Sequence, residues 1–433
     1  MPQSFHKLLS GKRVVVMVKR GFEKEEDSIE ADSLNGSADL ESSFFSHKKG
    51  KILYVTTISG FLPQFEKNDV SIAKSLGYEI HYASNFENNV YTIPDNYFES
   101  ENITRHHIGV TKSPLYVARN VKVIKQLTKL IDEEHINIVH CHNPMGGVVA
   151  RIAAQRSKSK PYVIYTAHGL HFYKGAPVIN WLLFYPVEKW LAHYTDEMVA
   201  INREDYSFMN GHFKLKQGGC FDLIHGVGVD INRFSPKPDM AMKKRDEMKI
   251  PREAFHIVTA AELNDNKNQK VVIEAISKMK NDNIYYTLCG KGNNKEKLEN
   301  LINEKKLSKR VKLVGYRTDM HEVLQTADAF AFPSIREGLG VAAVEALACG
   351  VPLIVADNRG TREYAVDRKN SLVCNAKESE SFKQAIEELS TNEALYRHLK
   401  SNCRETADNF SDKQTEKVMK KVYIRADKKV REQ

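Results

Sequence analysis

The segment from Phe332 to Ala346 contains the residues whose types and spacing say most about chemistry. It reads FPSIREGLGVAAVEA, which is a short apolar run, a glycine-rich turn and then an apolar stretch typical of a helix. Backbone N–H groups at such a turn and helix start bind anions such as a diphosphate. Glu337 and Glu345 supply carboxylates, which accept hydrogen bonds from sugar hydroxyls. The segment therefore predicts a site for a nucleotide sugar.

Each of the two glutamates also has a simpler interpretation. Glu337 precedes the predicted helix and could serve only as a favourable charge at its positive end, and Glu345 could be a solvated helix charge. For either residue alone we favour the simpler interpretation. Glu345 is flanked by alanine, valine and leucine, however, and these apolar neighbours argue against a fully solvated helix face. Taken together, the segment is a strong functional signal.

The elements that must position this segment follow from hydrophobic periodicity. From Lys51 onward, short apolar runs typical of buried strands alternate with stretches that have helical spacing. This alternation predicts parallel sheets covered by helices on both faces. The strands are expected at 52–57, 79–83, 136–141, 162–166, 197–201, 256–260, 285–289, 311–314, 329–332, 352–356 and 372–374, and the clearest helices at 116–134, 148–155, 271–279, 295–305 and 341–349.

A lapse in this alternation divides the chain, so the predicted fold is α/β with two doubly wound Rossmann-like domains facing each other across a cleft. Ligands of such sheets bind at the carboxyl ends of the strands, so the cleft is the expected site. The predicted parts are a disordered leader (1–50), an N-terminal acceptor-side domain (51–228), a linker (229–255), a C-terminal nucleotide-sugar domain (256–410) and a basic C-terminal helix or tail (411–433).

Composition excludes several protein classes. The 433 residues are 42% hydrophobic and 27% charged, which is ordinary for a soluble globular protein and unlike a disordered or fibrous chain. No apolar run approaches the ~20 residues of a membrane-spanning helix, and the N-terminus does not resemble a signal peptide. Six widely spaced cysteines are typical of reduced thiols in a cytoplasmic protein. The net charge of +9 comes without a nucleic-acid-binding motif.

The E-x7-E spacing of Glu337 and Glu345 resembles that of retaining glycosyltransferases of family 4, which have the GT-B architecture. The resemblance extends over about residues 51–425. The run from His168 to Gly175, HGLHFYKG, is similar to the bacterial capsule and exopolysaccharide branch of that family. Further segments that agree are 166–169, 225–230, 262–268, 315–328 and 359–360.

This resemblance implies roles for the residues of the turn. Glu345 would hold the ribose hydroxyls of the donor nucleotide, and Glu337 would hold the transferred sugar. The backbone at Gly338 and Leu339 would meet the diphosphate. In the N-terminal domain, Gly60 stands where the family has a glycine-rich loop, although only one glycine is present here.

The resemblance also implies a cationic grip on the donor phosphates. Lys267 matches the family's basic residue, although from sequence alone an exposed loop lysine would be the simpler interpretation. Glu262 is a departure, because many family members carry an arginine there. Arg336, Lys270 or Lys291 could compensate, which leaves the second phosphate-binding cation open.

Histidines of the N-terminal domain are the other candidate chemistry. His168 follows a predicted strand at the mouth of the cleft, where a histidine can donate to a sugar hydroxyl or shuttle a proton; the alternative is a turn histidine bonded to backbone. The resemblance favours the catalytic role. His140, Cys141 and His142 suggest a metal, but two histidines without a third ligand at suitable spacing make a weak zinc site. We therefore expect structural or cleft-edge residues and no essential metal.

The stretch from Trp181 to Leu191 is dense in aromatic and aliphatic residues. The first interpretation is a core-packing helix interrupted at Pro186. The second is an interfacial surface that approaches a bilayer, assisted by residues 412–433, which carry eight basic and four acidic side chains. Peripheral contact with the inner face of the cell membrane is the corresponding expectation.

The sequence as a whole predicts a glycosyltransferase without nucleic-acid partners. It would move a hexose or N-acetylhexosamine from a nucleotide sugar, a UDP-sugar by preference, to a polyprenyl-diphosphate-linked saccharide destined for a surface polysaccharide. Two alternatives stay open, namely a sugar-nucleotide epimerase of the same fold and a catalytically silent homologue that binds nucleotide sugars. A dehydrogenase is excluded because no G-x-G-x-x-G follows a first strand.

Overall fold

The computed structural model describes residues 50–87, 91 and 93–432. The leader predicted for residues 1–50 therefore lies outside the described residues, apart from Gly50. Regular structure begins with a strand at Lys51, where the sequence predicts it.

Within the described residues, the N-terminal half of the chain forms a seven-stranded sheet in which all neighbouring strands are parallel. The strand order is β3-β2-β1-β4-β5-β6-β7. The central strands are buried because helices cover both faces, in agreement with their continuous apolar sequences. The strands are β1 (Lys51–Val55), β2 (Glu79–Ser84), β3 (Ile103–His107), β4 (Ile138–His142), β5 (Tyr162–Ala167), β6 (Glu197–Ala200) and β7 (Cys220–Leu223).

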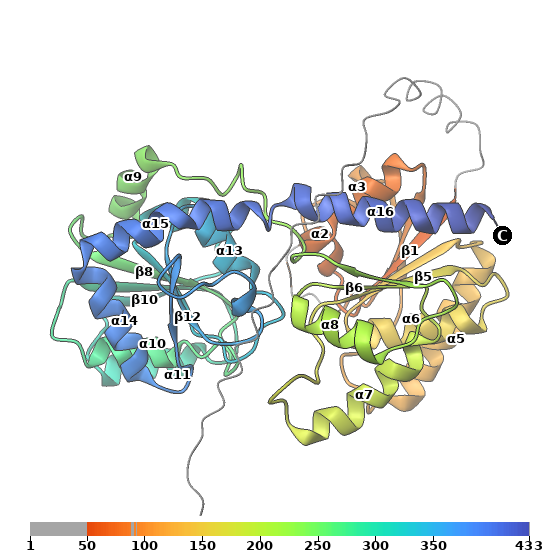
Figure 1. Ribbon diagram of the computed structural model, residues 1–433, viewed down its shortest axis with the longest axis horizontal. Coiled ribbons are helices and arrows are strands. Elements are labelled where there is room, and N and C mark those ends of the chain that lie inside the picture. The colour runs from red at the N-terminus through yellow and green to blue at the C-terminus, as the bar shows by residue number, and fades with distance from the viewer. Residues whose placement is uncertain (1–49, 88–90, 92, 433) are drawn as a thin grey trace, which may run out of the picture. The chain divides into compact units, whose positions relative to one another are not determined.

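The C-terminal half repeats this plan with six described strands, again all parallel, in the order β10-β9-β8-β11-β12-β13. The prediction of two doubly wound α/β halves is thereby confirmed, and Figure 1 shows helices around both sheets. The strands are β8 (Phe255–Ala260), β9 (Ile284–Cys289), β10 (Val311–Gly315), β11 (Ala329–Phe332), β12 (Leu353–Ala356) and β13 (Ser371–Cys374).

Amphipathic helices bury their apolar stripes on the two sheets. Those of the N-terminal half are α2 (Phe61–Phe65), α3 (Lys67–Ser75), α4 (Tyr97–Ser100), α5 (Val117–Glu133), α6 (Pro144–Arg156), α7 (Val178–Ala192) and α8 (Arg203–His212). The later ones are α9 (Pro238–Met248), α10 (Lys270–Ser277), α11 (Lys295–Glu304), α12 (Met320–Val323), α13 (Val341–Ala348), α14 (Ser379–Thr391), α15 (Glu393–Asp408) and α16 (Asp412–Arg431). Helix α9 thus lies within the stretch predicted as a linker. No helix of the described residues has the length and apolarity that crossing a bilayer requires.

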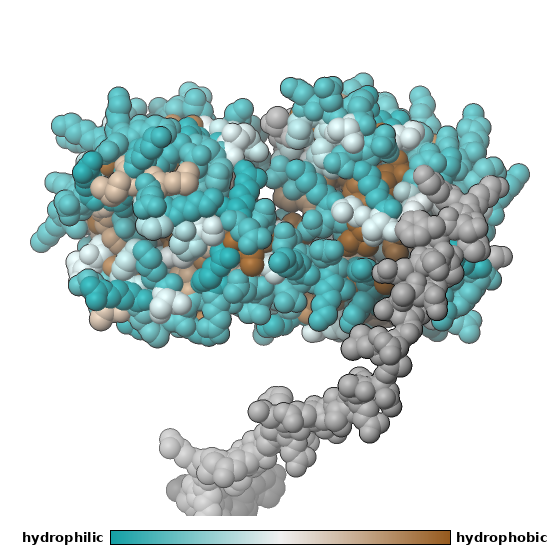
Figure 2. All heavy atoms as spheres, turned by 90° about the horizontal axis from the view of Figure 1, so that it is seen from above, coloured by the Kyte–Doolittle hydropathy of each residue, from teal (hydrophilic) through white to brown (hydrophobic). Residues whose placement is uncertain are grey.

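The C-terminal helix α16 returns to the first sheet, where it packs near α3, β5 and β7 (Figure 1). Its inner side buries four apolar side chains in the same core as Tyr54, namely those of Met419, Val422, Tyr423 and Ala426. Helices α5, α6 and α7 pack on the core of the opposite sheet face, which contains Leu53 and Val55. Helices α16 and α7 are therefore separated by the sheet. Figure 2 shows the molecule from above relative to Figure 1. On this face the described surface is mostly hydrophilic with scattered hydrophobic residues.

Helix α7 corrects the prediction made for the stretch from Trp181 to Leu191. The helix runs without interruption through Pro186, and only three of its residues are buried, namely Glu188, Leu191 and Ala192. Leucine and tryptophan side chains remain exposed, with 66% for Leu182 and 49% for Trp190. Trp181 and Tyr185 do pack on the core, so the helix is apolar on both its inner and its outer side. The core-packing interpretation is wrong for the outer side.

Arg359 joins the two halves. Its guanidinium is buried, with Nη1 2.7 Å from Oδ1 of Asp205, and it donates from Nη2 to the Leu170 carbonyl over 2.7 Å. The same group lies 4.7 Å from the ring centroid of Tyr173. Asp205 is 1% exposed and also accepts a hydrogen bond from Leu170 N–H. The pair therefore fixes the loop after β5 against the loop after β12.

We predict that Arg359→Met lowers the free energy of unfolding by about 3–5 kcal/mol, because it leaves the Asp205 carboxylate buried without its cation. Urea unfolding followed by circular dichroism measures the change. The matched control is Arg362→Met, which removes an exposed ion pair with Asp357 and should cost less than about 1 kcal/mol. Equal effects of the two substitutions would contradict the assignment.

Candidate active site

The glycine-rich turn lies where the sequence predicts it, between β11 and α13. Gly340 precedes α13 with a φ of 96°, a conformation that favours glycine. A Cβ atom there would also lie 2.5 Å from the ring of Phe332. Leu339 is buried, and its side chain occupies the space beside Gly226. The turn is therefore held tightly, with its backbone at the end of a central strand.

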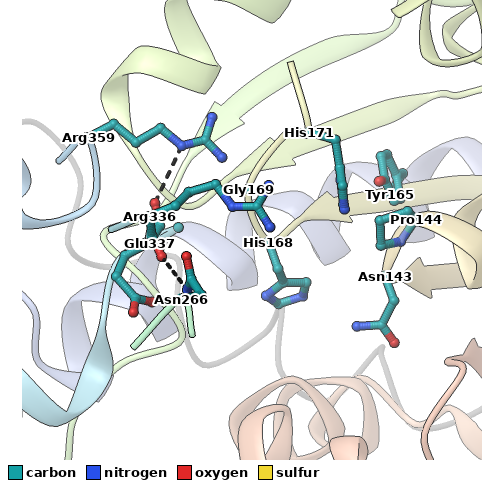
Figure 3. A pocket seen from close by; sticks show the side chains of 11 residues that line it. Asn143, Pro144, Tyr165, His168, Gly169, His171, Asn266, Arg336, Glu337 and Arg359 are labelled. Carbon is teal, nitrogen blue, oxygen red and sulfur yellow. Dashed lines mark hydrogen bonds between the residues drawn. The ribbon is translucent and has the colours of Figure 1, made fainter. Parts of the chain in front are cut away.

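A cavity of about 230 Å³ lies between this turn and the carboxyl ends of β4 and β5 (Figure 3). The N-terminal half contributes Asn143, Pro144, Tyr165, His168, Gly169 and His171, and the C-terminal half contributes Asn266, Arg336, Glu337, Gly338 and Arg359. Of the residues predicted from the sequence, the cavity brings together His168, Glu337 and Gly338. Its position agrees with the rule that ligands of doubly wound sheets bind at the carboxyl ends of strands.

Lys267 reaches the edge of this site through an ion pair. Its Nζ lies 2.6 Å from Oε1 of Glu337, and both side chains are mostly buried. The Lys267 ammonium also lies 5.4 Å from the ring centroid of Phe332. The simpler interpretation, an exposed loop lysine, is therefore wrong. The Lys267 ammonium forms an ion pair with a carboxylate at the cavity wall.

Glu345 and Gly60 are not among the residues that line the cavity. Glu345 is partly buried in α13, and this burial raises the pKa of its carboxyl to about 7, with an opposing contribution from Arg233. Gly60 precedes α2, and a Cβ atom there would lie 2.5 Å from the Tyr91 carbonyl oxygen. Close backbone packing alone therefore explains why a glycine stands at position 60, without any contact to a ligand.

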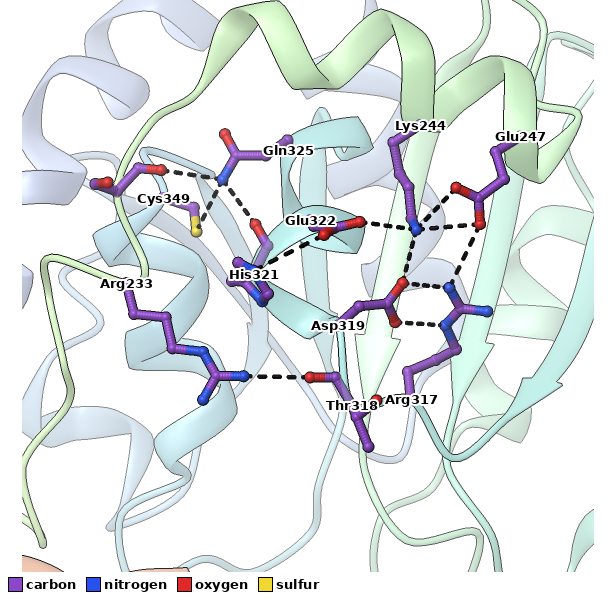
Figure 4. A network of polar contacts seen from close by, with 11 residues as sticks. Arg233, Lys244, Glu247, Arg317, Thr318, Asp319, His321, Glu322, Gln325 and Cys349 are labelled. Atoms are coloured by element: carbon purple, nitrogen blue, oxygen red, sulfur yellow. Dashed lines mark hydrogen bonds and ion pairs between the residues drawn. The ribbon is translucent and has the colours of Figure 1, made fainter.

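A network of charges fixes the backbone beside Arg233 (Figure 4). The Lys244 ammonium of α9 lies 2.6 Å from Asp319 and 3.0 Å from Glu322. Arg317 pairs with the same Asp319 carboxylate, and these two cations hold its pKa well below the usual range. Arg233 donates to the neighbouring Thr318 carbonyl over 3.2 Å. The network therefore positions the cation that opposes the effect of burial on Glu345.

Three histidines of the N-terminal half, His140, His142 and His168, belong to one polar cluster. His140 and His142 are fully buried on β4, on the face that the strand period predicts they share. His142 Nδ1 lies 3.1 Å from His168 Nε2, and Glu66 Oε1 lies 3.5 Å from each of these nitrogens. Glu66, between α2 and α3, is the third ligand-type group that sequence spacing did not reveal. The nitrogen–nitrogen hydrogen bond accounts for the spacing of the cluster.

Burial dominates the electrostatics of this cluster. It lowers the pKa of His168 to about 4 and that of His140 to about 3, and it lowers that of His142 strongly. Burial also raises the pKa of Glu66 and takes that of the adjacent Asp69 carboxyl to about 7. The histidines are therefore neutral near pH 7, and the carboxyls are driven toward their neutral forms.

Other cavity residues were missed by sequence reasoning. Arg359, Asn266 and His171 each stood inside a resembling segment but carried no individual prediction. Of the three cations considered as replacements near Glu262, Arg336 lines the cavity, whereas Lys291 lies 5.8 Å from the ring centroid of Tyr316.

Comparison with known proteins agrees with this arrangement. Residues 51–202 match the family described as "Glycosyl transferase 4-like", and residues 241–406 match "Glycosyl transferases group 1". The chain is 37% identical over 377 residues to the protein of Bacillus subtilis (strain 168) named as glycosyltransferase EpsD, covering 86% of this chain and 96% of that one. It is 26% identical to an Escherichia coli UDP-Gal:alpha-D-GlcNAc-diphosphoundecaprenol alpha-1,3-galactosyltransferase, with 71% and 82% covered.

Solved structures share the architecture. Anabaena Alr3699/HepE, determined in complex with UDP, aligns with a TM-score of 0.70 at 18% identity over 87% of this chain and 99% of its own. WaaG, a glycosyltransferase involved in lipopolysaccharide biosynthesis, aligns with a TM-score of 0.66 at 15% identity over 86% of this chain and 98% of its own. The fold is GT-B. With a cavity between two Rossmann-like halves and matches along both, the chain belongs to the glycosyltransferases of the 4-like and group 1 family.

Proposed function

We propose that this chain is a retaining glycosyltransferase that moves a hexose or N-acetylhexosamine from a UDP-sugar to a polyprenyl-diphosphate-linked saccharide in surface polysaccharide synthesis. One observation carries the proposal. His168 from the N-terminal half and Glu337 with Gly338 from the C-terminal half line a single cavity. A donor diphosphate at the turn and an acceptor hydroxyl beside the histidine would then meet within it.

The donor side of the proposal rests on charge. Lys267 is paired with Glu337, so a bound diphosphate can replace the carboxylate as the partner of the ammonium, and Glu337 is then free to contact the sugar. Arg336 at the cavity wall supplies a second cation where the family has an arginine in place of Glu262. The UDP complex of HepE and the UDP-Gal named for the Escherichia coli relative favour uridine as the nucleoside of the donor.

The acceptor side rests on the relatives. The Escherichia coli relative is named for an acceptor on diphosphoundecaprenol, and so is a Campylobacter jejuni relative that is 25% identical over 331 residues.

In the proposed step, the bond from the anomeric carbon to the diphosphate breaks while a bond to the acceptor oxygen forms on the same face. The acceptor proton passes to the departing diphosphate, so no external base is consumed. Cations of the chain stabilise that diphosphate, and we propose that no divalent metal is needed.

We expect acceptor-dependent release of UDP from one UDP-sugar in a panel of UDP-, GDP- and ADP-sugars tested with and without a lipid-linked monosaccharide. Glu337→Gln should lower kcat by about 100-fold, because it removes a charge that contacts the reacting sugar. Exposed Glu405→Gln on α15 is the matched control and should leave kcat unchanged.

The same assay separates the alternatives. Activity should persist in EDTA, and its loss with recovery on adding a divalent ion would overturn the metal-free mechanism. NMR of the product should show the anomeric configuration of the donor. Conversion of the donor to an epimer without acceptor would instead identify an epimerase, and donor binding without turnover would identify a silent homologue.

Donor binding should also depend on pH through Glu345, whose carboxyl has a pKa of about 7. A carboxylate accepts from both ribose hydroxyls, whereas the protonated form has lost acceptor capacity, so UDP should bind more tightly as the pH rises. Between about pH 6 and pH 8 the ionised fraction increases about tenfold, and affinity should follow. Calorimetry on the wild type and on Glu345→Gln isolates this contribution, because the pH dependence of UDP itself is common to both. Identical pH profiles would remove Glu345 from the donor site.

We further propose that the outer side of α7 and the start of α5 form a membrane-binding face. Helix α7 exposes Leu182, Leu183 and Trp190, and Leu115 before α5 is 85% exposed. Both helices pack on the same core, with α6 between them. Residues 112–129 contain five basic side chains and no acidic one, and all five are exposed: Lys112, Arg119, Lys122, Lys125 and Lys129. Lys129 pairs with Glu133 over 3.4 Å. Exposed apolar side chains beside such a row of basic residues suit an anionic lipid surface.

We expect Leu182→Ser with Leu183→Ser to weaken partitioning onto phosphatidylcholine vesicles containing phosphatidylglycerol by at least about tenfold, since two leucines no longer bury apolar area. Vesicle flotation measures the partitioning. Lys122→Glu with Lys125→Glu should weaken it too, whereas Lys417→Glu with Lys420→Glu on α16, across the sheet, should not. If partitioning depended on the α16 lysines alone, the membrane contact would lie on the C-terminal helix, and the proposed face would be wrong.

A further inference from the structure

Three polar groups at the cavity wall and behind it lie close together, and the proposed reaction does not explain why. Glu66 follows α2, His142 ends β4, and His168 follows β5. His142 Nδ1 and His168 Nε2 are 3.1 Å apart, and Glu66 Oε1 is 3.5 Å from both. His168 alone of the three reaches the cavity. The arrangement therefore places two buried groups against one nitrogen of the histidine that faces the ligand.

The surroundings of His142 determine which of its nitrogens carries the proton. His142 Nε2 is buried and has no hydrogen-bond partner among the described residues. A buried N–H without an acceptor is rarer and more costly than an unused acceptor. The proton of the neutral ring therefore resides on Nδ1, from which His142 donates to His168 Nε2.

The state of His168 follows from this contact. Its Nε2 accepts the hydrogen bond and so carries no proton itself. Burial lowers the pKa of the ring to about 4, so near pH 7 it holds a single proton. That proton resides on Nδ1, the ring nitrogen that His142 and Glu66 leave free. His168 thus enters the cavity as a hydrogen-bond donor.

Glu66 supports the same tautomer if it is a neutral acid. Desolvation and repulsion by Asp69 both raise the pKa of its carboxyl. Within the part of the chain that the structure describes, the titratable groups that face the cluster lie on or next to β1, β2, α3, β4, β5 and α16 and include no lysine or arginine: Tyr54, Asp69, Tyr82, His140, His142, His168 and Tyr423. Glu66 Oε1 is buried without a hydrogen-bond partner among the described residues, so it can accept a long second contact from the Nδ1–H of His142, 3.5 Å away.

We propose that His142 and Glu66 are positioning residues that hold His168 as the tautomer protonated on Nδ1, so that it donates a hydrogen bond to an oxygen of the bound sugar and does not act as a base. The role of the ligand rests on the proposed function, but the tautomer does not. The proposal fits a reaction in which the departing diphosphate takes the acceptor proton, because the histidine then needs only to orient an oxygen.

NMR of the full-length protein labelled with ¹⁵N-histidine tests the tautomer directly. Long-range ¹H–¹⁵N correlations distinguish protonated from unprotonated ring nitrogens. His168 and His142 are assigned by the signals lost in His168→Asn and His142→Asn. We expect protonation at Nδ1 of both rings near pH 7, and a proton on His168 Nε2 would overturn the proposal. This readout is independent of whether any sugar is transferred.

The cluster also has ligand atoms within 4.8 Å of one another, as in a metal site. Metal analysis of the protein used for NMR therefore accompanies the experiment. Zinc bound in equimolar amount, with His142 Nδ1 unprotonated, would overturn the proposal in favour of a metal centre. Metal-free protein with His142 Nδ1 protonated supports it.

Paired substitutions test the positioning roles in the transferase assay. Glu66→Gln keeps a neutral acceptor oxygen, and in His142→Asn the amide nitrogen takes the place of Nδ1, so both should keep kcat within about threefold of wild type. Glu66→Leu and His142→Leu lack these polar groups and should lower kcat about tenfold with an unchanged KM for the donor sugar. Circular dichroism verifies folding.

A Glu66→Gln variant as impaired as Glu66→Leu would show that the ionised carboxylate matters and would overturn the proposal. If no donor is turned over by the wild type, the proposed function fails, whereas the NMR result still decides the tautomer.

Discussion

The buried guanidinium of Arg359 is the interaction on which the site depends. It pairs with Asp205 and bonds to the Leu170 carbonyl, two residues beyond His168. It also bonds to the Glu337 carbonyl over 3.4 Å. A single planar cation thus ties both walls of the cavity. A lysine could not do this, because its three N–H groups share one nitrogen, whereas Arg359 reaches these acceptors from three separate nitrogens of a planar group.

The two walls divide the electrostatic work. The C-terminal half presents Lys267 and Arg336 toward the position where a diphosphate would develop charge. The N-terminal half presents neutral imidazoles: burial lowers the pKa of His142 and His168, and burial together with Arg336 and Arg359 lowers that of His171. A cation on that second wall would compete for the phosphates, whereas a neutral donor orients an oxygen without drawing the anion across. In the proposed reaction, this division of charge would let one cavity hold an anionic leaving group and an uncharged acceptor.

Sequence reasoning predicted the elements that bury continuous apolar runs, and it located the turn around Glu337 because glycine and helix-start signals are local. It missed β3 and β7, whose sequences ITRHH and CFDL are only partly buried at the sheet edges and so lack a clear period. Glu66 could not be predicted, because a glutamate between two short helices looks like a solvated charge until the fold buries it. The interpretation of α7 failed for the converse reason, since apolarity alone does not say which side is covered.

Helix α7, whose outer side is exposed, comes soon after the site residue His168 in the chain. The loop after His168 runs into α7, which begins at Val178, and Phe172 within that loop packs against Trp181 and Tyr185 on the inner side of the helix. The His171 ring at the cavity lies 4.8 Å from Phe184 of the same helix. The inner side of α7 therefore holds the loop that carries the catalytic candidate, while its outer side is free. Under the proposed function, one helix would contact the membrane with its outer side and hold the loop that follows His168 with its inner side.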